Sequence, residues 1–259
     1  MGNHHSTPPA LVAPVHFPAA ISPRLTRQRV VALHLESCFW SHSRHEPMEI
    51  RDVLANLIMF RIPAPSHAHH KTRRLLDMYN SSIATMELLD ESSYSTHYRI
   101  RGTVNEARND AFTQTVSTEE PCQVDIHTET HESTVTVLTT WGSHADGEQA
   151  KITCEGDWLA RSATFWLETT SNPDAKSCVA RVFCERPGDE STYCVEIAPG
   201  VDIALILLIC AALDEAMKPQ LKMKIQTRNR MAASEHGRQT LGSEMACSPV
   251  KTSAILVPV

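Results

Sequence analysis

The chain has 259 residues, a formal net charge of −6 and a sequence pI of about 6.1, with 42% hydrophobic and 21% charged residues. These values suit a globular protein with a sizeable core, and the acidic balance argues against a nucleic-acid binder, which normally carries a basic face. The eight cysteines form no CxxC pair and no apolar leader opens the chain. We therefore expect a cytoplasmic, non-secreted protein with reduced thiols, with a Cys184–Cys194 disulfide as an alternative.

Residues 1–27 contain five prolines and no sustained hydrophobic period, which predicts a flexible N-terminal arm. The arm opens with Met1-Gly2-Asn3-His4-His5-Ser6. This pattern fits N-myristoylation at Gly2, and the alternative is a chance match at a polar terminus. One myristoyl chain binds membranes only marginally, so stable attachment would need a second signal.

Residues 28–218 are the predicted folded domain. Its strand-like segments alternate apolar with polar residues or are rich in β-branched residues, and they cover residues 97–102, 134–138, 163–167, 178–184 and 193–197. Turn-forming clusters separate them at residues 142–147, 171–174 and 186–189. Short strands with a turn every ten or so residues predict an all-β sandwich or barrel.

A helix is predicted directly after the last strand, over Ile203 to Met217. Asp202 is a suitable N-cap, and Pro219 ends the helix. The helix is apolar on every face for about three turns, so it must be buried on all sides. Its uncharged run is eleven residues long, whereas a membrane span needs about 20. We therefore expect this helix to thread a barrel.

These segments resemble the LURP-one-related family. Residues 192–205, continuing to Asp214-Glu215, are similar to the family's C-terminal signature, in which a strand leads through Ala-Pro-Gly-Val-Asp into an apolar helix. Residues 155–159 resemble its Gly-Asp-Trp element, and residues 73–77, 83–86 and 179–182 resemble further strands. The signature positions are Gly156, Asp157, Trp158, Pro199, Gly200, Asp202, Asp214 and Glu215.

The resemblance implies a mainly β fold, a tubby-like closed barrel of about twelve strands around a central, buried, hydrophobic C-terminal helix. Tubby C-terminal domains and phospholipid scramblases are related to this family, and the resemblance implies no catalytic residue and no cofactor. Met78-Tyr79-Asn80 stands where the family has a glycine, but Asn80 can adopt the same left-handed turn. Residues 104–157 hold eleven acidic residues against Arg108 and Lys151, so the basic lipid-binding face of tubby-type domains is not evident.

Residues 219–259 are predicted to form a basic, disordered tail. The segment around its start has no acidic residue between Ala216 and Ser234, and it holds five candidate membrane-contact residues: Lys218, Lys222, Lys224, Arg228 and Arg230. Each such cation can contribute about 1 kcal/mol near an anionic leaflet. The alternatives are a solvated tail or a short extra strand.

Chemical motifs are few. His67, His69 and His70 lie together, but a structural zinc site needs four converging ligands, and we interpret this segment as a surface loop without a metal. The chain has no G-x-S-x-G elbow, no P-loop and no G-x-G-x-x-G. We therefore expect no catalytic residue, no metal and no cofactor.

These inferences together predict a non-enzymatic binding or scaffold protein that is peripheral at membranes and contacts anionic phospholipid. The alternative is a soluble protein-interaction module that binds protein partners without a lipid role, and a remote alternative is an enzyme with its site in the barrel loops. We expect a monomer without nucleic-acid partners.

Overall fold

The computed structural model describes residues 8–14, 17, 21, 23–36, 48–63, 71–92, 95–102, 123–131, 134–142, 149–169, 172–184 and 192–217. The chain divides into two units, Met1–Lys218 and Pro219–Val259, and every described residue belongs to the first. The predicted tail, with its candidate membrane-contact residues, and the predicted acceptor Gly2 lie outside the described residues.

Twelve strands and one helix make up most of the described residues. The strands are β1 (Val31–Glu36), β2 (Met48–Asp52), β3 (Ile58–Ile62), β4 (Thr72–Asp77), β5 (Ser82–Glu91), β6 (Ser95–Gly102), β7 (Gln123–His131), β8 (Thr134–Gly142), β9 (Gln149–Asp157), β10 (Ser162–Thr169), β11 (Asn172–Phe183) and β12 (Thr192–Ile197). A short 3-10 turn, Pro23–Leu25, precedes β1. The C-terminal helix covers residues 203–217.

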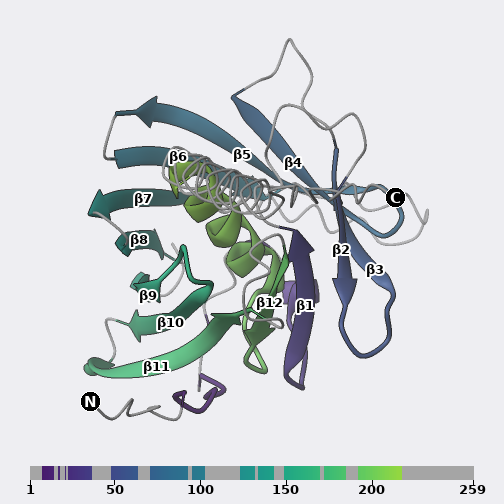
Figure 1. The fold of residues 1–259 in the computed structure, drawn as a ribbon, viewed down its shortest axis with the longest axis horizontal. Coiled ribbons are helices and arrows are strands. Elements are labelled where there is room, and N and C mark those ends of the chain that lie inside the picture. The colour runs from purple at the N-terminus through teal and green to yellow at the C-terminus, as the bar shows by residue number, and fades with distance from the viewer. Residues whose placement is uncertain are drawn as a thin grey trace, which may run out of the picture. The chain divides into compact units, whose positions relative to one another are not determined.

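The strands are antiparallel and hydrogen-bonded in the order β1-β12-β11-β10-β9-β8-β7-β6-β5-β4-β3-β2. β1 pairs with β2 as well as with β12, so the order returns to its start (Figure 1). The β1–β2 ladder contains two residue pairs, Leu33↔Asp52 and His34↔Arg51, whereas β1 and β12 share six. The expected mainly β fold with a C-terminal helix is confirmed.

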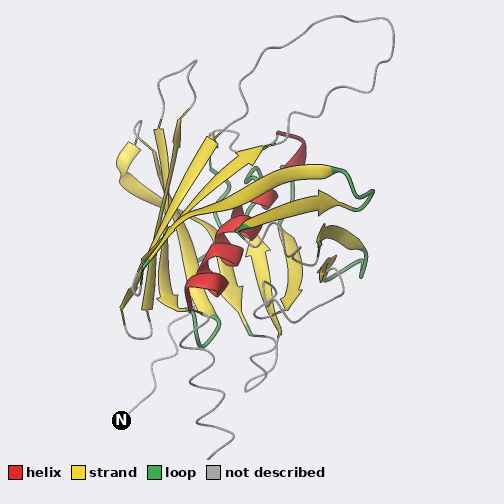
Figure 2. Cartoon of the chain, turned by 90° about the horizontal axis from the view of Figure 1, so that it is seen from above, coloured by secondary structure: helices red, strands yellow, loops and turns green. Residues whose placement is uncertain are grey.

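The helix lies inside the ring of strands (Figure 2). Alternate strand residues are buried toward it, as Leu33 and Leu35 of β1 and Ile100 of β6 show. Every helix residue from Ile203 to Asp214 is buried, with at most 2% of its surface exposed. The predicted start, burial and cap of the helix are confirmed, because Asp202 Oδ1 accepts hydrogen bonds from the backbone N–H groups of Ala204 and Leu205.

One predicted turn is wrong. Residues 171–174 were expected to form a turn because they contain asparagine, proline and aspartate, but β11 begins at Asn172. Asn172 pairs with Thr169 of β10, next to a register shift. Pro173 is tolerated because a proline, which lacks the backbone N–H, can stand at the start of a strand or beside a bulge.

The described residues of the predicted arm are hydrogen-bonded to the barrel. Val12 N–H donates to the Cys178 carbonyl of β11, and the Pro9 carbonyl accepts from Arg181. Ile21 N–H donates to Asp202 Oδ2 at 2.7 Å, so the carboxylate that caps the helix also holds the arm. The mobility of residues 1–27 stays a prediction, and these contacts concern only the described residues Pro9, Val12 and Ile21. Within the described residues, no helix is long and apolar enough to cross a bilayer.

Candidate functional site

Asp214 is a buried carboxylate of the C-terminal helix. It lies near the end of the helix and receives three hydrogen bonds from the strands and turns around it. Trp158 Nε1–H and Arg161 Nη1–H donate to its Oδ1 at 2.9 and 2.6 Å, and Tyr193 O–H donates to its Oδ2 at 2.9 Å. A buried charge is tolerated when it is paired and its hydrogen bonds are made, and Asp214 meets both conditions.

The Arg161 guanidinium completes this buried cluster. Its Cζ lies 4.5 Å from the Tyr193 ring centroid and 5.4 Å from that of Trp158, so the cation contacts two aromatic faces as well as Asp214. Neither the Arg161 nor the Asp214 side chain is exposed to solvent. The cluster therefore fixes the helix inside the ring and is closed to a ligand.

The family signature around Gly156 shapes the turn that delivers Trp158 and Arg161. Gly156 has a φ of +130°, and a Cβ there would lie 2.3 Å from the Ser162 carbonyl oxygen, so only glycine fits. Asp157 Oδ1 accepts from Ala160 N–H, and Arg161 has a φ of +54°. These residues are structural because they form a tight turn between β9 and β10.

Two buried thiols lie near this cluster. Burial raises the pKa of Cys154 to about 12, and burial together with the nearby Asp214 raises that of Cys210 well above its usual value. Both thiols are therefore protonated at neutral pH and are poor nucleophiles. The alternative Cys184–Cys194 disulfide is not formed.

Glu215, the last signature residue, acts electrostatically on Arg73 and Tyr98, two buried strand residues. Burial lowers the pKa of the Arg73 guanidinium, and the Glu215 carboxylate opposes that shift. Burial and then Glu215 raise the pKa of Tyr98. The Glu215 carboxylate at the end of the helix therefore acts electrostatically on two side chains of the surrounding strands.

The outer surface carries a different feature, an exposed apolar group on two neighbouring hairpin turns. We call it the apolar rim, and its members are Val53, Leu54, Leu57, Met78 and Tyr79. Leu54 is 83% exposed and Tyr79 is 79% exposed, whereas large apolar side chains are normally buried. The two turns are adjacent because β3 pairs with β4 at Phe60↔Asp77, next to both turns.

Each turn is closed by an aspartate and a left-handed asparagine. In the β2–β3 turn, Ala55 N–H donates to Asp52 Oδ1 and Asn56 N–H to the Asp52 carbonyl, and Asn56 has a φ of +52°. The β4–β5 turn repeats this design with Asp77, which accepts from the N–H groups of Tyr79, Asn80 and Ser81. The expected left-handed conformation of Asn80 is confirmed by its φ of +65°.

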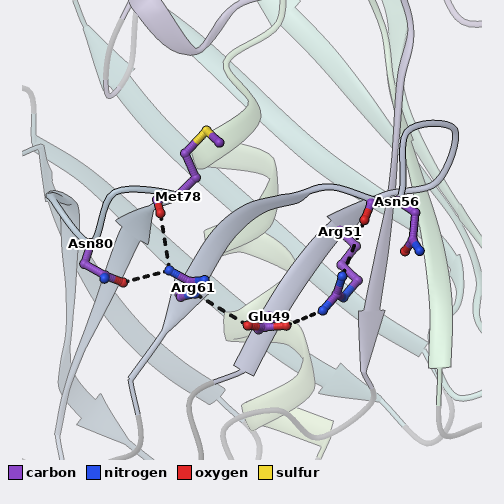
Figure 3. Close-up of polar contacts among 6 residues, drawn as sticks. All are labelled: Glu49, Arg51, Asn56, Arg61, Met78 and Asn80. Atoms are coloured by element: carbon purple, nitrogen blue, oxygen red, sulfur yellow. Dashed lines mark hydrogen bonds and ion pairs between the residues drawn. The ribbon is translucent and has the colours of Figure 1, made fainter.

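An arginine network joins the two turns (Figure 3). Arg61 donates to the Met78 carbonyl at 3.3 Å and to Asn80 Oδ1 at 3.1 Å, and it forms an ion pair with Glu49 at 3.6 Å. Arg51 donates to the other Glu49 oxygen and to the Asn56 carbonyl. Two hairpins are thereby tied into one unit with cationic side chains behind the apolar rim.

Sequence reasoning identified the cluster only in part. Trp158 and Asp214 were named from the family signature, but their partners Arg161 and Tyr193 were not. A buried aspartate in an apolar helix requires a cation and donors, so that requirement was the available signal. The apolar rim was also missed, although an exposed tyrosine where the family has a glycine marked one of its turns.

The described residues contain no group of three or more His, Cys, Asp or Glu side chains placed to hold a metal ion. His97 and His127 stack with ring centroids 3.9 Å apart on the outer face of β6 and β7. The histidines at positions 67, 69 and 70 lie outside the described residues.

The sequence model of the LURP-one-related family matches residues 31–214 of the chain. This chain belongs to the LURP-one-related family. That match spans the ring of strands, the Gly156 turn and the helix as far as Asp214, so the family region coincides with the structure described above. No curated protein matches this LURP-one-related chain.

A solved structure, an X-ray structure of a protein from Arabidopsis thaliana, is similar at 17% sequence identity and a TM-score of 0.46. The similarity covers 76% of this chain and 97% of that one.

Proposed function

We propose that this LURP-one-related protein is a non-enzymatic binding protein that works through its outer surface and attaches peripherally to membranes. The observation that carries the proposal is the filled interior. Ligand-binding barrels keep a cavity among their inward side chains, but here the buried helix occupies that space. We further infer that the short β1–β2 ladder keeps the ring closed, so that contacts with partners form outside it.

Membrane attachment is supported by chemistry at both ends of the chain. Gly2 fits a myristoylation acceptor, and the cations from Lys218 to Arg230 could supply the second signal that a single acyl chain needs. The alternative function is a protein-interaction module without a lipid role. The exposed apolar rim supports it, because exposed apolar patches mark protein interfaces as well as membrane-interaction sites.

Co-sedimentation with liposomes tests the proposal. Unmodified and myristoylated protein are compared on vesicles of rising anionic lipid content, at low and at moderate salt. We expect binding that rises with anionic lipid and with myristate and falls with salt, because exposed charges are screened. Absence of binding under every condition would contradict the membrane role and favour the protein-interaction alternative.

A further inference from the structure

We propose that the apolar rim is a membrane-insertion site, with Leu54, Leu57 and Tyr79 entering the interface of an anionic bilayer. This inference rests on the proposed function and names the surface that contacts the lipid. It differs from attachment through Gly2 or the basic tail, because the rim belongs to the folded barrel.

The first argument is the backbone of the two turns. Burial of an unpaired N–H in an apolar medium costs several kcal/mol, and a bilayer offers few partners below its headgroups. In the β2–β3 turn, the N–H groups of Val53, Ala55 and Asn56 already donate to protein oxygens. In the β4–β5 turn, residues 79–81 do the same through Asp77. These N–H groups can therefore leave water with their hydrogen bonds already made.

The second argument is the order of side chains along the hairpins. Leucine and tyrosine stand at the tips, and tyrosine is enriched where hydrocarbon meets headgroups. Arg51 and Arg61 lie on the strands behind the tips (Figure 3). Strands advance about 3.3 Å per residue, so arginines a few residues back reach headgroup depth when the tips enter the interface.

The third argument is the charge beside the rim. Val53 N–H donates to the Ala32 carbonyl, which places the start of β1 next to the β2–β3 turn. Arg27 and Arg29 are exposed just before that start. Near the rim, the four arginines Arg27, Arg29, Arg51 and Arg61 outnumber the three carboxylates of Glu49, Asp52 and Asp77, which keep their charge while accepting hydrogen bonds. The surroundings of the apolar tips therefore carry a net positive charge, which is complementary to an anionic leaflet.

The arrangement favours a lipid surface over a protein partner. The exposed side chains stand on two hairpin turns that the Arg61–Glu49–Arg51 network braces against each other. A protein partner would have to provide a surface shaped to both turns, whereas a bilayer adapts its shape to an inserted wedge.

The test uses the unmodified full chain and two vesicle types, phosphatidylcholine alone and phosphatidylcholine with phosphatidylserine. Leu54→Ser and Tyr79→Ser are each expected to weaken binding to the mixed vesicles by roughly tenfold, because each removes a large inserted side chain. Leu89→Ser is the matched control, since Leu89 is an exposed leucine on β5, about ten residues from the Tyr79 turn. It is expected to bind as the wild type does.

A second measurement reports insertion directly. In Tyr79→Trp, the added tryptophan should shift its emission to the blue on binding and should be quenched by brominated lipid. If both serine variants bind as the wild type does, or the new tryptophan stays in water, the rim does not insert, while peripheral attachment through other segments stands. If the unmodified wild type binds neither vesicle type, this proposal fails, whereas the proposed function is decided separately by the myristoylated protein.

A second copy of the chain is the competing occupant. Sedimentation velocity without vesicles, run over a range of concentrations, detects it. A dimer that Leu54→Ser and Tyr79→Ser abolish would overturn the membrane assignment. A monomer at all concentrations is the expected result.

Discussion

At the scale of the residue, Gly156 and Gly200 allow the energetic cost of steric crowding to be distinguished from the cost of a strained backbone. Both have positive φ values, but a Cβ at Gly200 meets nothing within 4 Å, whereas at Gly156 it would overlap backbone atoms of the next strand. Gly200→Ala should therefore lower the free energy of unfolding by about 1 kcal/mol. Gly156→Ala should add an overpacking cost of about 1–3 kcal/mol. Urea unfolding of both variants measures the difference, and equal losses would contradict the tight turn.

The buried tyrosines predict how stability depends on pH. Burial raises the pKa of Tyr193 and of Tyr98 in the folded protein above the unfolded value of about 10. The unfolded chain therefore loses these protons first, and the stabilisation is complete below about pH 10 and is lost as pH rises above it. Urea unfolding at increasing pH should show this decline. Tyr193→Phe should lose the Asp214 hydrogen bond at neutral pH yet decline less steeply, and an unchanged slope would contradict the assignment to Tyr193.

At the scale of the element, the helix is the part of the molecule that tolerates charge least. Leu207 is 1% exposed inside the ring, so Leu207→Asp would place an unpaired carboxylate in an apolar core. We expect a loss of more than about 4 kcal/mol and an unfolded or aggregated product. Leu54→Asp is the matched control, because Leu54 is largely exposed, and it should keep the wild-type circular dichroism and melting temperature. A folded, soluble Leu207→Asp protein would contradict the central helix.

The β2–β3 hairpin is attached more weakly than the strands elsewhere in the ring. It shares two residue pairs with β1 and two with β4, whereas β9 and β10 share eight. Local opening follows the number of contacts that must break. Backbone amides of Met48–Ile62 should therefore exchange with deuterium faster than those of β9 and β10. Equal protection would show that the hairpin opens only with the whole barrel.

At the scale of the whole molecule, the features that could be predicted from the sequence are those that depend on a residue pattern within one segment. The apolar run from Ile203 to Leu213 required complete burial, and strands precede it throughout, so a helix inside a β ring followed from physical reasoning. Alternation in β6 and β12 located inward residues. The family resemblance added the expected number of strands.

Features that depend on register could not be predicted from sequence. Arg161 reaches Asp214 only because the left-handed turn after Gly156 directs it inward, although the two residues are 53 positions apart in the sequence. Leu54 and Tyr79 come together through the β3–β4 pairing, which no local pattern specifies. Pro173 misled the turn prediction because its effect depends on whether its missing N–H would have had a partner.

The position of the helix has a consequence for how the protein is made. A ribosome synthesises the strands first and the segment that fills them last. Until residues 203–214 have left the exit tunnel, the inward faces of the strands have no core to pack against, so the domain cannot fold in steps as synthesis proceeds. A nascent chain that stops before Asp202 would carry all twelve strands and still lack the helix that fills them. The apolar inward faces of the strands therefore stay without their core until the helix is complete, and a premature stop removes that core.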